Sequence, residues 1–437
     1  MSGGPRRRFR LVAVLYATLF FNAALLELNS YQLLTASQLG PFSVPVLLAA
    51  IFLGLGVFYV PARLGQPLGW LAEACLGRVA GGFVSRFLLP AWLLTWCGFV
   101  SELGVRCLRY SLFPETPSFP NENPFLLGCA LLIWFCVIVV ASRASPTSFS
   151  QTAVLPLKLS VVVFVGLAIS SRPWESNSLG WVVFSDSDPY VRLLNSIVLW
   201  GGPPILFVGN WLGPPPNEGR SYPASVVLES MALGVVLPVI LAFLLGGLTV
   251  VGATGISNLY WKLPSYLGYA AARISHLGWV KLLLMTFTLL MAARFAANLA
   301  VMQVVRARNW ATTSAVVAIL TLPVIFLDSG LVWGAWCVPA TLFLPLAGVF
   351  TSAYLIRGAD LTLPATARHV ALCAWISGSA VACIPLGARW TPLLVVSEHS
   401  WPLAGWLTAL LFMYAGRSKV AEPSAATGGH TRDDQSE

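Results

Sequence analysis

The sequence predicts an all-α integral membrane protein with about twelve transmembrane helices. Composition is the first observation behind this prediction: the 437 residues are 57% hydrophobic and 10% charged, with a mean hydropathy of +0.77. A soluble domain of this length could not cover its surface with so few charges. Apolar runs of about 20 residues, each long enough to cross a bilayer as a helix, recur along the whole chain. The third observation is an uneven distribution of basic residues between the two sides of the predicted membrane.

The predicted spans divide the chain into three parts. A basic arm covers residues 1–10, a transmembrane domain covers 11–416, and a polar tail, expected to be disordered, covers 417–437. Within the domain, helices 1–5 occupy about 11–170, helices 6–10 about 192–356 and helices 11–12 about 367–416. The spans are 11–36, 43–60, 83–105, 124–142, 153–170, 192–212, 223–252, 279–304, 311–328, 333–356, 367–386 and 402–416.

The basic residues orient these helices. With an even number of spans both termini lie on one side, and that side carries 15 Lys and Arg residues against eight on the other. The positive-inside rule therefore predicts a multi-pass protein of the cell membrane with both termini in the cytoplasm. The excess of basic residues on the cytoplasmic side of the lipid bilayer then accounts for the net charge of +9. We expect no nucleic acid as a partner.

Helix 1 carries a carboxylate close to the centre of its span, Glu27. An ionised group at this depth is costly and is a candidate for a functional role. Two interpretations stay open. Either Glu27 faces an internal site, or helix 1 is shifted along its axis so that Glu27 reaches the outer interface.

Helix 3 follows a Gly-rich, charged stretch, 61–82, that suits a cytoplasmic loop with a short interfacial helix. Trp92 and Trp96 lie four residues apart, so both rings occupy one face of helix 3. Trp96 is near mid-span, where a role in the interfacial aromatic belt is not expected. It serves either core packing or the binding of a flat ligand by stacking.

Helix 6 is interrupted by Gly201-Gly202-Pro203-Pro204, which directly follow Leu199 and Trp200. The prolines lack N–H groups, so the carbonyls of Leu199 and Trp200 lose their helical partners, and the glycines weaken the helix further. Backbone groups freed inside a bilayer must line a protein-enclosed or wet cavity. A helix broken near mid-membrane is typical of transporter binding sites, so the sequence predicts a discontinuous helix 6 beside a central site.

Helix 8 places Arg294 near the middle of 279–304, with Asn298 one turn further along the same face. About ten residues, or about 15 Å, separate Arg294 from the cytoplasmic end, which is too far for snorkelling. Arg294 must therefore have a partner or face water. It either belongs to the site or bonds the freed carbonyls of a broken neighbouring helix.

The remaining residues give little indication of chemistry. The eight cysteines form no C-x-x-C pair, and the four histidines are scattered near loops, helix ends and the tail. Helices 9–12 look like structural scaffold, without a candidate site residue. We therefore expect no catalytic residue, no cofactor and no metal site, and a protein that is not an enzyme.

Several short motifs resemble the nucleobase–cation symporter family of cytosine, purine and hydantoin permeases. They are Arg63-Leu-Gly-Gln-Pro-Leu-Gly, Cys75-Leu-Gly-Arg-Val-Ala-Gly, Trp92 to Gly98, Gly201-Gly202 with downstream Asn210, and Asn298 ahead of a basic loop. The resemblance implies a LeuT-type fold, in which two inverted repeats of five helices surround a central site.

The same resemblance implies roles for individual residues. Trp96 would stack on a planar base and Asn298 would hydrogen-bond its polar edge. The unwound stretch with Trp200, Gly201, Gly202 and Pro203 would supply backbone contacts.

The chain also departs from the family pattern. Val100 stands where the family often has Gln, Asn210 lacks a matching Asp, and Pro203 replaces a Trp after the paired glycines. Ala292 and Ala293 occupy the helix 8 positions whose hydroxyls bind sodium in coupled members. We therefore expect Arg294 to replace sodium electrostatically, with Glu27 as a possible partner. The protein would then be coupled to protons through Glu27, or it would be an exchanger or a uniporter.

The sequence thus favours a sodium-independent secondary active transporter of a small planar nitrogenous solute such as a nucleobase, working by alternating access. Two alternatives remain. One is an amino-acid or polyamine permease of the same fold. The other is a transporter-like membrane sensor that binds its ligand without moving it.

Overall fold

A computed structural model describes residues 59–60, 63–66, 68–89, 91, 128, 132, 222–231, 319, 329–383 and 402–421. All regular secondary structure in these ranges is helical: α4 (Leu68–Phe83), η3 (Val84–Leu88), α11 (Ala224–Met231), α16 (Ser329–Arg357), α17 (Ala365–Cys383), α19 (Pro402–Ala415) and α20 (Arg417–Ala421). Within these ranges no helix meets the length and hydropathy that a membrane crossing requires.

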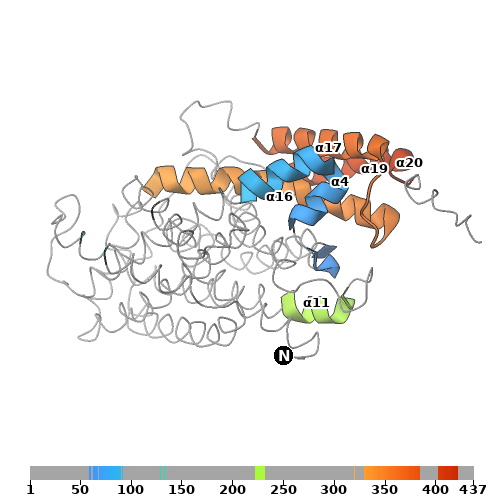
Figure 1. Ribbon diagram of the computed structural model, residues 1–437, viewed down its shortest axis with the longest axis horizontal. Coiled ribbons are helices and arrows are strands. Elements are labelled where there is room, and N and C mark those ends of the chain that lie inside the picture. Colours follow the sequence, from blue (N-terminus) through green and yellow to red (C-terminus); the bar gives the residue numbers. More distant parts are fainter. Residues whose placement is uncertain are drawn as a thin grey trace, which may run out of the picture.

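The helices α16, α17 and α19 form a C-terminal bundle, and α4 lies across it (Figure 1). Their bounds lie close to three of the predicted spans: 333–356 for α16, 367–386 for α17 and 402–416 for α19. Local sequence explains two of these bounds. Gly358 takes φ +73° and donates its N–H to the Tyr354 carbonyl, which ends α16. Pro364 stands directly before α17, where its missing N–H costs nothing.

The bundle is packed through small residues. A methyl group on Gly378 of α17 would lie 2.5 Å from the Gly405 carbonyl oxygen of α19, and one on Gly405 would lie 2.5 Å from the Gly378 carbonyl oxygen. Such close backbone approach is how helices associate where no water is available to drive burial. On the α16 side, Phe343 and Phe350 are fully buried.

The α4 helix is two segments joined at a sharp kink. Gly77 adopts φ 84° and ψ 172°, a conformation that L-residues rarely take, and the chain folds back on itself there. As a result, a methyl group on Gly81 would lie 2.5 Å from Glu73 Cα, and one on Gly69 would lie 3.0 Å from Ser85 Cβ. The second segment then continues into the π-helical turn η3, which lies at the start of predicted helix 3, 83–105.

Two sequence predictions change in this region and at the C-terminus. The stretch 61–82, expected to be a loop with a short interfacial helix, contains all but the last residue of the 16-residue helical hairpin α4. Residues 417–421, assigned from their polar composition to a disordered tail, form α20 instead. Val420 of α20 is fully buried, and this apolar contact, one side chain in a polar segment, explains why composition alone was misleading.

Candidate functional site

None of the predicted site residues can be placed, because Glu27, Trp96, Trp200, Gly201, Gly202, Pro203, Arg294 and Asn298 all lie outside the described residues. The described residues with the richest set of long-range polar contacts form a different region. We call it the junction: residues 59–60 and 63–66, the first segment of α4, Tyr222 ahead of α11, the connection 357–364, Arg368, Tyr354 and α20.

Arg63 organises one side of the junction. Its guanidinium carbon lies 5.8 Å from the centre of the Tyr59 ring and 5.6 Å from the centre of the Tyr354 ring, and Nη1 donates to the Tyr59 hydroxyl at 3.3 Å. A guanidinium between two aromatic rings is held by cation–π attraction while its charge stays partly hydrated. Arg63 therefore links the end of predicted helix 2 to α16.

The next residues link the same loop to α11. The Tyr222 N–H donates to the Arg63 carbonyl at 2.8 Å, and Tyr222 is only 3% exposed. Its ring fills the space beside Gly65, which adopts φ +59°. A side chain on Gly65 would occupy the position of the ring, so only glycine allows this contact.

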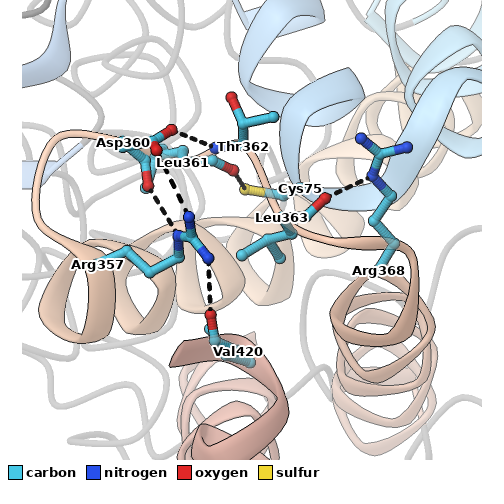
Figure 2. Close-up of polar contacts among 8 residues, drawn as sticks. All are labelled: Cys75, Arg357, Asp360, Leu361, Thr362, Leu363, Arg368 and Val420. Carbon is cyan, nitrogen blue, oxygen red and sulfur yellow. Dashed lines mark hydrogen bonds and ion pairs between the residues drawn. The ribbon is translucent and has the colours of Figure 1, made fainter. Parts of the chain in front are cut away.

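A second set of contacts ties α4 to the connection between α16 and α17 (Figure 2). The Leu363 N–H donates to the Ala74 carbonyl at 3.2 Å, and the Cys75 thiol points at the Leu361 carbonyl at 3.8 Å. Arg368 Nε donates to the Leu363 carbonyl at 2.9 Å. Leu361 and Leu363 are fully buried, so this short segment packs its apolar side chains inside, and the Leu361 and Leu363 backbone groups named above bond α4 and Arg368.

Arg357 closes the junction against α20 (Figure 2). Nη1 donates to the Val420 carbonyl at 3.1 Å, Nε donates to the Asp360 carbonyl at 3.4 Å, and Nη2 lies 3.5 Å from Asp360 Oδ2. Asp360 Oδ1 in turn accepts the Thr362 N–H at 3.0 Å. A cation at the C-terminal end of α16 also suits the helix dipole.

The junction offers no chemistry of its own. Complete burial raises the pKa of the Cys75 thiol to about 12, which keeps it protonated and unreactive near neutral pH. Among the described residues, no three His, Cys, Asp or Glu side chains are grouped so that they could hold a metal ion. The arrangement can connect helices but gives no sign of a nucleophile or an acid–base pair.

The four connecting segments that meet here have one property in common. They follow predicted helices 2, 6, 10 and 12, and in the predicted topology every even-numbered helix ends on the same side of the membrane. Sequence reasoning assigned the four to one side by charge and parity, without any indication that they touch.

Comparison with solved structures identifies the fold. Mhp1, a nucleobase-cation-symport-1 family transporter in a closed conformation with bromovinylhydantoin bound, aligns over 95% of this chain and 92% of its own, at 18% identity and a TM-score of 0.57. The manganese transporter of Eremococcus coleocola aligns over 95% and 94%, at 14% identity and 0.54. MhsT in complex with L-phenylalanine aligns over 94% and 98%, at 14% identity and 0.54.

The chain has the all-α fold of a membrane transporter. The alignments cover nearly the whole of this chain and of each neighbour, so the likeness in fold is not confined to one part of the chain. No protein-family model matches the sequence, and no curated protein matches it.

Proposed function

We propose that this protein is a secondary active transporter of a small planar nitrogenous solute, such as a nucleobase, that works by alternating access and without sodium. The observation that carries the proposal is the alignment of 95% of the chain with Mhp1, a nucleobase-cation-symport-1 family transporter. The motifs that resemble this family support the same substrate class. The proposal includes the LeuT-type inverted repeat, a cell-membrane location with cytoplasmic termini, and no catalytic role.

The proposed binding site lies at the break in helix 6. Backbone groups of Trp200, Gly201, Gly202 and Pro203 would contact the solute, since the prolines leave carbonyls unpaired there. Trp96 would stack on the planar ring and Asn298 would bond its polar edge. Glu27 and Arg294 would form the coupling pair, with the guanidinium at the position where sodium-coupled members of the family hold the cation.

Uptake into proteoliposomes tests the proposal. We expect accumulation of at least one nucleobase or hydantoin, equal in sodium and in choline buffers, and dependent on an inward proton gradient. Strict sodium dependence would refute the coupling assignment. Binding of such a solute without any uptake would favour a membrane sensor instead.

Variants separate the proposed roles. Trp96→Ala and Asn298→Ala should weaken solute binding by about tenfold or more each, because a stacking contact or a buried hydrogen bond contributes about 1–3 kcal/mol. Glu27→Gln should flatten the pH profile of uptake with less effect on solute affinity. Gly128→Ala is a suitable control, because nothing lies within 4 Å of a methyl group at that position.

A second candidate is an amino-acid permease, favoured by the alignment with MhsT in complex with L-phenylalanine. The same uptake assay distinguishes the two. Transport of an amino acid or a polyamine that nucleobases do not inhibit would replace the first candidate with the second.

A further inference from the structure

The second segment of α4 and the following turn η3 present an apolar row to the outside. Val79 is 90% exposed, Phe83 51% and Phe87 68%. They lie four residues apart, so they follow one another along a single face. The rings of Phe83 and Phe87 stack with their centres 6.0 Å apart, which makes the row continuous.

A basic row runs directly beside it. Arg78, Gly82 and Arg86 also lie four residues apart, and both arginines are exposed. Between them, Gly82 has no side chain to cover the helix backbone, and nothing lies within 4 Å of a methyl group placed there. The two arginines are about 12 Å apart along the axis, since eight residues separate them at about 1.5 Å each. Their long side chains can therefore converge over Gly82.

No ion pair neutralises the two arginines of this face within the described residues. Neither Arg78 nor Arg86 has an ion-pair or hydrogen-bond partner there. The sole acid of 68–89 is Glu73, whose backbone lies across the hairpin beside Gly81, so one carboxylate stands against two guanidinium groups. Arg368 adds a positive charge at the Gly77 end of the two rows, because its Cδ would lie 3.4 Å from a methyl group on Gly77. Its Nε is held by the Leu363 carbonyl, which fixes where the guanidinium sits.

We propose that this face binds an anionic phospholipid. The phosphate would lie over Gly82 between Arg78 and Arg86, and the acyl chains would lie along Val79, Phe83 and Phe87. Basic residues next to apolar surface at a membrane boundary recognise this combination of charge and hydrocarbon. The proposal rests on the membrane location contained in the proposed function, but it does not depend on transport.

The chain's own acidic tail is a weaker candidate for the same face. Residues 422–437 contain Glu422, Asp433, Asp434 and Glu437 but no large apolar side chain. They could neutralise the arginines and would leave the apolar row uncovered. A lipid satisfies both rows at once.

Lipid titration of the purified, delipidated full-length chain tests the proposal, with native mass spectrometry and thermal unfolding as the two readouts. We expect phosphatidylglycerol to bind and to raise the melting temperature, and phosphatidylcholine to do so much less. Glycerol 3-phosphate, which supplies the headgroup without acyl chains, should have no effect. Equal stabilisation by phosphatidylcholine, or the full effect with glycerol 3-phosphate alone, would overturn the proposal.

Three variants locate the site. The Arg78→Gln/Arg86→Gln double variant should lose roughly 30-fold in phosphatidylglycerol affinity, because two charges near an anionic surface are removed. Gly82→Leu should weaken binding while keeping both charges, since it fills the proposed phosphate position. Arg417→Gln removes an exposed arginine of α20 whose guanidinium lies over the ring of Tyr414 in α19, and it should leave lipid affinity unchanged. Wild-type affinity in both site variants would overturn the proposal.

The failure of this proposal can be told apart from failure of the proposed function. Lipid binding is measured without any solute, and uptake can be measured in phosphatidylcholine vesicles that contain no anionic lipid. A chain without residues 422–437 should keep the lipid affinity, and a rise of tenfold or more would show that the tail occupies the face instead.

Discussion

The C-terminal bundle and the junction are held together in different ways. In the bundle, α17 and α19 approach until a methyl group on Gly378 would lie 2.5 Å from a carbonyl oxygen. Two of the bundle's buried polar atoms, Ser379 Oγ and Trp406 Nε1, have no partner among the described residues. The bundle also has two side-chain bonds between its helices, donated by Ser352 Oγ and Trp375 Nε1 to carbonyls of neighbouring helices, each at 3.0 Å. In the junction, most of the contacts that join distant segments are of this polar kind, from backbone and side-chain donors to carbonyls. Close backbone approach therefore distinguishes the bundle from the junction, and substitutions should affect the two regions differently.

The largest effect is expected from breaking the shape of the bundle. Gly378→Leu would place side-chain atoms where Gly405, Ala409 and Pro345 now lie. Because three neighbours from two helices would have to move, we expect a loss of stability of about 3 kcal/mol or more. Size-exclusion chromatography and thermal unfolding in detergent would detect it as a loss of folded, monodisperse protein.

Gly128→Leu is the matched control, since it is the same substitution at a position with open space around it. A similar loss of folded protein in both variants would mean that leucine is harmful for reasons other than packing. It would contradict the account of the bundle given above.

A smaller effect is expected from Gly65→Ala in the junction. The alanine would have to adopt φ +59° and would meet the Tyr222 ring, so we expect a loss of about 2 kcal/mol. The double variant Gly65→Ala/Tyr222→Ala removes the steric part and keeps the backbone part. Thermal unfolding would be compared for the wild type, the two single variants and the double variant. We expect Gly65→Ala to destabilise the protein less when Tyr222 has been replaced by alanine. Strictly additive losses of stability would show that the ring and the glycine are not coupled.

Arg357→Gln should cost less, about 1–2 kcal/mol, because it removes the bonds to the carbonyls of Val420 and Asp360. Asp360→Asn should cost no more than about 0.5 kcal/mol. Asp360 is 66% exposed, and exposed ion pairs contribute little. If the two variants lower the melting temperature equally, the ion pair and not the link to α20 is what Arg357 provides.

The smallest effect is expected at Cys75. A maleimide should not label this thiol in the folded protein at pH 8, and should label it after denaturation in SDS. Burial raises its pKa from 9.0 to about 12, so the folded chain keeps a proton that the unfolded chain releases. The contribution of Cys75 to stability is therefore constant below pH 9 and decreases between pH 9 and about 12. Cys75→Ala should remove that part of the pH dependence, and rapid labelling of folded protein would contradict it.

Much of the bundle could be predicted from sequence, because local rules decide it. Apolar runs marked out the helices, and Gly358 and Pro364 stand where one ends and the next begins. The kink at Gly77 could not be predicted in the same way. Gly69, Gly77 and Gly81 look alike in a Gly-rich stretch, yet Gly77 turns the chain and the other two permit close approach.

The junction was beyond sequence reasoning for a related reason. Most of its hydrogen bonds are accepted by backbone carbonyls, such as those of Ala74, Leu361 and Val420. Every residue type has a backbone carbonyl, so the sequence does not show which of them accepts a bond. The same holds for α20, whose order depends on contacts across the fold. The solute site proposed around the helix 6 break stays a prediction, since its residues lie outside the described ranges.

The contact between Cys75 and Leu361 spans 286 residues of sequence, and this separation has a consequence for biosynthesis. At about 5–20 residues per second, a ribosome needs roughly 15–60 s to make the intervening chain. Throughout that interval the α4 hairpin has been synthesised but its cover at 361–363 has not. The hairpin therefore stays uncovered until most of the protein has been synthesised. If synthesis ends before Leu361, the chain contains the whole hairpin but lacks the segment that covers it, and chaperones and proteases can recognise the exposed surface.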